Sequence, residues 1–263
     1  MQKSDNLTSH LSKEYDSQIG NTIPHYDLFH EEILNLIESM DIKPNSWLDT
    51  GCGTGNLVEK ALQKFPDTVF IMADPSVDML KNAKEKLVEY TGRIKFLEPI
   101  PSQDISLSNK PSKIGDFRGA ENSTNFRKCN AFSNSQNSSN FEDFRAVDVI
   151  TAIQSHHYLS ENERYKAVKS CYNNLNENGV YVAFENIRPL TEKGKEIGKE
   201  YWKRFQISKG KTVEEAENHI KRFGVEYFPI TIEEHISLLK EIGFSAVELF
   251  WYSYMQAGFY CIK

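Results

Sequence analysis

The chain alternates short apolar runs with longer segments of helical periodicity. The runs are rich in Val, Ile and Phe and too short for helices, so each is interpreted as a strand buried on both faces. They occupy 46–49, 69–73, 94–97, 147–152 and 180–184. Strands that alternate with helices pair in parallel, and the helices then cover both faces of the sheet. The sequence therefore predicts an α/β fold on a mostly parallel sheet.

Apolar residues at helical spacing connect these strands. The predicted helices span 26–40, 56–64, 76–90, 162–175 and 231–242, and two more are expected within 191–229. The end of the chain differs, because two strand-like runs, 246–252 and 257–262, follow each other closely. They predict an antiparallel hairpin at one edge of the sheet.

Composition argues against several classes of protein. Lys and Arg number 31 against 37 Asp and Glu, and the net charge of −6 disfavours a general nucleic-acid-binding protein. No apolar run is long enough for a membrane span, and the polar N-terminus shows no secretory signal. The four cysteines are far apart and form no zinc motif. We therefore expect a cytoplasmic protein with no membrane association and no metal site.

The same patterns divide the chain into parts. The expected parts are a flexible N-terminal arm at 1–22, a core at 23–105 and 146–190, an insertion at 106–145, a helical cap at 191–229, and a C-terminal helix with the strand hairpin at 230–263. The insertion is rich in Ser and Asn, so a surface loop is predicted, although its Phe residues could dock a partner. The lysine-rich start of the cap is either a solvated helical face or a basic side turned toward an anionic substrate.

The stretch Leu-Asp-Thr-Gly-Cys-Gly-Thr-Gly after the first strand carries the chemistry. Glycines at alternate positions, Gly51, Gly53 and Gly55, allow positive φ and let backbone N–H groups approach a ligand closely. The helix that follows offers an N-terminus that favours negative charge. Asp49 ends the first strand, and Asp74 ends the second strand, where an acid can bind two ribose hydroxyls. These features predict a nucleoside-type ligand at the carboxyl ends of the strands.

The glycine turn, the two acids and the terminal hairpin together resemble the class I S-adenosylmethionine (SAM) methyltransferases. The resemblance spans 42–263 apart from the insertion, and it implies a Rossmann-like sheet with an antiparallel last strand. Within that class the chain looks like the group that contains carboxy-SAM synthases, whose Pro-x-Tyr is similar to Pro24-His25-Tyr26. Those synthases keep an Arg shortly before the last helix, where this chain has Phe228. Since a carboxylated cofactor would lose its cationic partner, plain SAM is preferred.

The resemblance also implies a set of site residues. The expected cofactor-binding residues are Tyr26, Asp49, Gly51, Cys52, Gly53, Gly55, Asp74, Pro75, Ser76, Met79, Gln103, Asp104 and Gln154. Met79 is expected under the adenine, and Gln103, Asp104 or a backbone carbonyl would meet the adenine amino group. His156 is the candidate catalytic base, with His157 or a Tyr as alternatives. Tyr254 is expected near the mouth of the site.

The function implied is SAM-dependent transfer of a methyl group to an unidentified, small-molecule acceptor by in-line displacement, with S-adenosylhomocysteine (SAH) as the second product. One alternative is an enzyme of the carboxy-SAM synthase type or one that modifies tRNA. Another is a SAM-binding protein without catalytic activity. A homodimer is possible by analogy with the similar synthases.

Overall fold

The computed structural model describes residues 5–107, 144–253 and 255–263. They form a sheet of seven strands in the order β3-β2-β1-β4-β5-β7-β6. The strands are β1 (Ser46–Thr50), β2 (Val69–Ala73), β3 (Ile94–Phe96), β4 (Val147–Ile153), β5 (Leu175–Asn186), β6 (Ala246–Ser253) and β7 (Gln256–Ile262). All pairs from β3 to β5 are parallel, and β7 is antiparallel to both β5 and β6. The predicted mostly parallel sheet with an antiparallel last strand is therefore confirmed.

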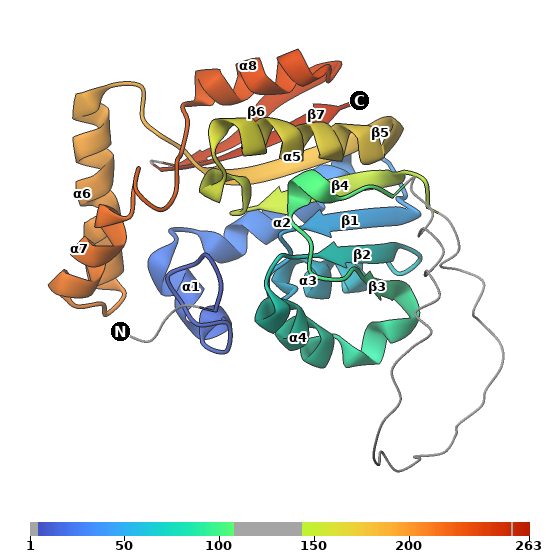
Figure 1. The fold of residues 1–263 in the computed structure, drawn as a ribbon, viewed down its shortest axis with the longest axis horizontal. Helices are drawn as coiled ribbons and strands as arrows, with labels where there is room; N and C mark the ends of the chain where they lie inside the picture. Colours follow the sequence, from blue (N-terminus) through green and yellow to red (C-terminus); the bar gives the residue numbers. More distant parts are fainter. Residues whose placement is uncertain (1–4, 108–143, 254) are drawn as a thin grey trace, which may run out of the picture.

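Helices cover the sheet on both faces (Figure 1). The helices are α1 (Tyr15–Thr22), α2 (Tyr26–Ser39), α3 (Asn56–Lys64), α4 (Val77–Lys86), α5 (Glu161–Asn174), α6 (Glu192–Ser208), α7 (Val213–Lys221) and α8 (Ile232–Ile242), with short 3-10 turns η1 (Val88–Arg93), η2 (Ser102–Asp104) and η3 (His156–Tyr158). One core packs apolar side chains of α2, α3 and α4 against the sheet. A second core packs α5 and α8 against the opposite face. This arrangement leaves the carboxyl ends of the parallel strands as the edge where connecting loops meet.

Local sequence explains where the helices begin and end. Thr231 and Glu234 form a capping box that starts α8, and Gly243 ends it with φ of 115°. Ser76 starts α4, because its hydroxyl accepts a hydrogen bond from the N–H of Met79. This cap fixes the turn between β2 and α4 at the carboxyl edge of the sheet.

The N-terminal part differs from the flexible arm that the sequence predicted. Its last eight residues form helix α1, in which Tyr15 and Ile19 are buried. The indole N–H of Trp202 in α6 donates to the carbonyl of Thr22, 2.6 Å away. The polar composition concealed this, because only one face of a short helix needs apolar residues to be buried.

Helices α6 and α7 are the two helices expected within 191–229, and they stand beside α1 at one end of the molecule (Figure 1). No helix among the described residues is long and apolar enough to cross a membrane. Most of the insertion predicted at 106–145 lies outside the described residues, as does Tyr254.

Candidate active site

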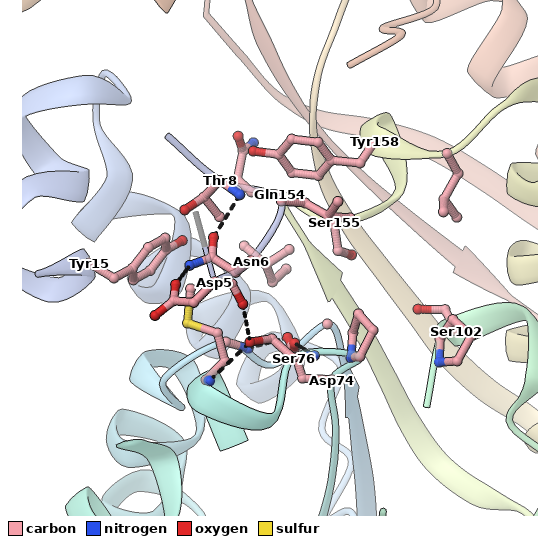
Figure 2. Close-up of a pocket in the computed structure, with 18 of the residues that line it drawn as sticks. Asp5, Asn6, Thr8, Tyr15, Asp74, Ser76, Ser102, Gln154, Ser155 and Tyr158 are labelled. Carbon is pink, nitrogen blue, oxygen red and sulfur yellow. Dashed lines mark hydrogen bonds between the residues drawn. The ribbon is translucent and has the colours of Figure 1, made fainter. Parts of the chain in front are cut away.

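A pocket of about 540 Å³ lies at the carboxyl ends of β1, β2 and β4. Its wall comes from five places in the sequence: the N-terminal segment, the glycine turn, the start of α4, the stretch around η2, and the residues after β4. Figure 2 shows Asp74 and Ser76 on one side, with Tyr15, Gln154 and Tyr158 on the other. The pocket therefore occupies the place that the sequence predicted for a ligand.

The glycine turn lets the chain bend sharply at the end of β1. The N–H groups of Gly51 and Cys52 both donate to the carbonyl of Ala73, at 2.8 and 3.0 Å, which ties the turn to β2. Gly51 has φ of 69°, and a Cβ there would lie 2.5 Å from Cβ of Ser155. Gly51 and Gly53 line the pocket, as predicted. Only glycine fits at position 51, since both the backbone angle and the close neighbour exclude a side chain.

Gly55 and Cys52 were predicted to bind the cofactor, but neither residue lines the pocket. A Cβ on Gly55 would lie 2.9 Å from Leu87 and 3.0 Å from Met72, so this glycine allows close packing of α3 against its neighbours. Cys52 is buried, and burial raises the pKa of its thiol well above the usual value. Both residues support the turn from within the core.

Asp74 presents its carboxylate to the pocket from the end of β2. Its two oxygens accept hydrogen bonds from the N–H groups of Gly53, at 2.9 Å, and Ser76, at 2.8 Å. These bonds fix the orientation of the carboxylate and leave lone pairs on both oxygens for a ligand. Burial raises the pKa of Asp74, although the two N–H groups oppose the shift. Pro75, Ser76 and Met79 also line the pocket, as predicted.

Asp49 lies beneath the site and does not line the pocket. Its carboxyl accepts a hydrogen bond from the Thr151 hydroxyl at 2.6 Å, and that hydroxyl accepts one from the indole N–H of Trp47. Burial raises the pKa of Asp49 to about 7, and the negative charge of Asp74 adds to the rise. Asp49 therefore supports the turn through a buried chain of hydrogen bonds.

Three buried polar atoms of pocket residues have no hydrogen-bond partner in the described chain. They are Oε1 of Gln103, Oε1 of Gln154 and Oγ of Ser155. Buried polar atoms are almost always paired in native proteins, so these three fit a polar ligand. Gln103 was one of two side chains proposed for the adenine amino group; the other, Asp104, lies in a separate surface cleft. Ser155 was not predicted, because its hydroxyl reaches the pocket only through the close approach to Gly51.

Neither histidine that follows β4 reaches the pocket, which contradicts the position predicted for a catalytic base. His156 is buried beside a small separate cavity, with Nδ1 3.2 Å from the Tyr181 hydroxyl. Burial lowers the pKa of His156 to about 4, so it stays neutral. Nδ1 of His157 lies 2.6 Å from the Glu185 carboxylate. The turn η3 directs both rings into the core and places Tyr158 at the pocket instead.

Tyr15 lies where the sequence predicted Tyr26. Tyr26 is buried and does not line the pocket, and its hydroxyl is 3.4 Å from that of Tyr15, which does. Tyr15 was missed because its helix was read as a flexible arm. No distinct sequence signal marks it, since its place depends on how α1 packs.

The N-terminal segment ahead of α1 covers part of the pocket. Asp5, Asn6, Leu7 and Thr8 all line it. The carbonyl of Asp5 accepts a hydrogen bond from the Ser76 hydroxyl at 3.1 Å (Figure 2). The carbonyl of Leu7 accepts one from Nη2 of Arg222, at the end of α7, at 2.8 Å. The segment therefore bridges the adenosine side expected at α4 and the helical cap.

A family model described as a methyltransferase domain matches residues 48–181, just over half of this chain. The chain belongs to this methyltransferase family. The carboxy-S-adenosyl-L-methionine synthase of Campylobacter concisus is 24% identical over 247 residues, which cover 90% of this chain and 86% of that protein.

Solved methyltransferase structures share the fold. The magnesium protoporphyrin IX methyltransferase of Synechocystis, solved with bound SAH, has a TM-score of 0.56 at 10% identity, with 92% of this chain and 85% of that one covered. A protein from Nostoc punctiforme, named as a candidate O-methyltransferase, has a TM-score of 0.59 at 14% identity and 96% coverage of this chain. This chain spans 58% of the length of the Nostoc protein.

The charged residues that line the pocket are all negative. Asp5 and Asp74 are its charged lining residues, and within the described part of the chain no Lys or Arg lines it. Phe228, which the resemblance to the carboxy-SAM synthases puts at the position of their Arg, lies in a different cleft. An anionic group in the pocket would therefore have no cation beside it.

Proposed function

We propose that this chain transfers the methyl group of SAM to a small-molecule acceptor by in-line displacement. The observation that carries the proposal is the carboxylate of Asp74, fixed by two backbone N–H groups at the end of β2 and open to the pocket. It is placed to accept hydrogen bonds from both hydroxyls of a ribose. Bound SAM supplies an electrophilic methyl group, so the chemistry needs little beyond orientation and exclusion of water.

The residues of the pocket are suited to binding more than to proton transfer. Burial raises the pKa of Tyr158 to about 12 and that of Tyr15 well above its ordinary value, so both hydroxyls keep their protons and act as donors. Gln103, Gln154 and Ser155 offer unpartnered polar atoms for the adenine and methionyl groups. The N-terminal segment limits access of water above them. We infer that the chain orients its substrates and holds them in a partly closed site.

The ribose assignment is tested with Asp74→Ala. Loss of the charged acceptor should weaken SAM and SAH binding by roughly 10- to 100-fold, the equivalent of about 1.5–3 kcal/mol. Isothermal titration calorimetry measures this directly. Asp78→Ala is the matched control, because Asp78 lies on α4 outside the pocket lining. Unchanged SAM affinity in Asp74→Ala would refute the assignment, and binding without SAH production from any acceptor would favour a non-catalytic SAM-binding protein.

A second candidate is a carboxy-SAM synthase activity, which the relative from Campylobacter concisus favours. The lining charges disfavour it, because a carboxylated cofactor would meet carboxylates and no cation. Native mass spectrometry of the purified protein distinguishes the two. SAM or SAH as the co-purified ligand supports methyl transfer, whereas a cofactor heavier by one carboxyl group supports the synthase. A tRNA substrate and a homodimer remain predictions.

A further inference from the structure

A second cleft, of about 350 Å³, lies between the start of α5, the residues after β5, helix α6 and the segment that joins α7 to α8. It shares no lining residue with the cofactor pocket. Four cations line it, Arg164, Arg188, Lys195 and Lys199, against one carboxylate, Glu161. This balance is the reverse of that in the cofactor pocket.

Arg164 is a buried cation with hydrogen-bonding capacity to spare. Only 3% of its surface is exposed. Its Nε donates to the carbonyl of His156, and its Nη2 donates to the carbonyls of Leu159 and Phe228. The remaining nitrogen, Nη1, has no hydrogen-bond partner among the described residues. Because Arg164 lines the cleft, it brings a fixed positive charge with free N–H groups to its wall.

Lys199 adds a second lining cation, one that makes no ion pair among the described residues. The other two cations are neutralised, since Arg188 binds both carboxylate oxygens of Glu234, at 2.7 and 2.8 Å, and Lys195 pairs with Glu192. Lys199 has no carboxylate within ion-pair distance in the described chain. Its Nζ lies 4.5 Å from the centre of the Phe223 ring. Burial lowers the pKa of Lys199, and the charge of Lys195, one helical turn away, lowers it further. A bound anion would relieve this repulsion.

We propose that this cleft binds a small oxyanion, a carboxylate or phosphate group, with Arg164 and Lys199 as its cationic partners. The uncharged lining residues of the cleft are apolar, among them Phe223 and Phe228, and Phe228 has 43% of its surface exposed. The ligand is thus a small molecule that carries an apolar or aromatic portion beside its anionic group. Charge-assisted hydrogen bonds from the two cations provide the recognition.

The site is tested by titration of inorganic phosphate and of benzoate into the full chain, followed by calorimetry at an ionic strength held constant with sodium chloride. We expect at least one probe to saturate at about millimolar concentration, a range typical of small anions held by few contacts. Saturation by phosphate alone or by benzoate alone identifies which oxyanion the cleft accepts. If neither probe saturates the protein below roughly ten times that concentration, the proposal is overturned.

Three variants separate a defined site from general attraction of anions. Lys199→Gln should weaken binding at least about tenfold, while Glu161→Gln, which removes the one lining carboxylate, should strengthen it. Lys193→Gln is the matched control, because Lys193 lies on the same helix, pairs with Glu196 and does not line the cleft. Equal effects of the two lysine variants would overturn the proposal. Asp74→Ala should leave anion binding unchanged, which keeps this result independent of the cofactor pocket.

Discussion

Two carboxylates at the ends of neighbouring strands have different roles in this protein. Asp74 is open to the pocket and held by backbone N–H groups, whereas Asp49 is enclosed and held by a threonine hydroxyl. Both follow an apolar strand, so the sequence predicted both as ligand contacts. The two carboxylates differ in their surroundings, because the register of β1 against β4 places Thr151 opposite Asp49. That side chain closes Asp49 off from the pocket floor.

The burial of Asp49 makes stability depend on pH. Its pKa is about 7 in the folded chain, against an ordinary value of 3.8. The contribution of Asp49 to stability is therefore greatest below about pH 4 and is lost as pH rises from about 4 through 7. Asp49→Asn removes this charge and keeps an oxygen for Thr151. The variant should exceed the native chain in stability by a few kcal/mol at about pH 8 and match it near pH 4. Urea denaturation without cofactor, at both pH values, measures the difference, and a constant difference would contradict the assignment.

Glu185, on β5, acts on the pocket indirectly. Its carboxylate accepts hydrogen bonds from the N–H groups of His156 and His157, both at 3.0 Å, and so fixes η3. Burial alone would raise the pKa of Glu185, but the bond to His157 and the nearby histidines lower it to about 2. This carboxylate therefore stays ionised at neutral pH and holds the turn that places Tyr158 at the pocket.

Glu185→Gln should displace η3, because an amide offers one acceptor oxygen to two N–H groups and a ring. We expect a loss of about 3 kcal/mol in stability and a several-fold weaker affinity for SAM below the melting temperature. The exposed Glu177→Gln on the same strand is the control. Titration of SAM into folded protein, checked by circular dichroism, separates the two effects. If the folded Glu185→Gln variant binds SAM as tightly as the native chain does, Glu185 contributes to stability and not to cofactor binding.

At the scale of elements, the glycine turn combines two kinds of glycine. Gly51 is forced by a close neighbour as well as by its backbone angle, whereas a Cβ on Gly53 would meet open space at φ of 54°. The turn thus requires glycine at position 51 for steric and conformational reasons, and at position 53 for the conformational reason alone.

The basic residues of helix α6 also fall into two groups. Lys193, Lys195 and Lys203 pair with glutamates one turn away, while Lys199 does not. The paired lysines fit the solvated face among the two interpretations of the cap, whereas Lys199 lines the cleft proposed to bind an anion.

Alanine at positions 51 and 53 should therefore differ in effect. Gly51→Ala combines the left-handed backbone with a clash at Ser155 and should lower the unfolding free energy by roughly 2–4 kcal/mol. Gly53→Ala has the backbone penalty alone, about 1–2 kcal/mol. Urea denaturation of both variants gives the comparison. Equal losses would mean that Ser155 does not approach Gly51 as closely as described.

At the scale of the whole molecule, the pocket is closed by parts of the chain that are far apart in sequence. The N-terminal segment contacts the start of α4 through Ser76 and the end of α7 through Arg222. Helix α1 joins the glycine turn, since the carboxylate of Asp16 accepts hydrogen bonds from Thr54 and Asn56 and pairs with Lys86. The core and the N-terminal part therefore enclose the site together, and the cap holds the N-terminal segment through Arg222.

Removal of residues 1–12 should open the site and leave α1 in place. We expect SAM to dissociate about tenfold faster, the equivalent of ~1.4 kcal/mol if the association rate is unchanged. Stopped-flow measurement of SAM release tests this. Arg222→Gln, which loses the contact to the Leu7 carbonyl together with the ion pair to Glu226, should give an intermediate rate. Release at the native rate from both variants would show that the N-terminal segment does not cover the cofactor.

The sequence alone determined the sheet, its helices and the part of the site that follows directly from β1 and β2. The spacing of apolar residues indicates which segments are buried, and glycines and acids at strand ends indicate the local backbone conformation. Gly51, Gly53, Asp74 and Ser76, which line the pocket, could therefore be chosen as site residues from the sequence. The tertiary structure decided which neighbouring side chains reach the pocket. His156 turns inward because Tyr181 and Glu185 offer it buried partners, and Tyr15 reaches the pocket because α1 packs against α6. Such contacts join residues far apart in the chain, and no local pattern encodes the partner of a side chain across that distance.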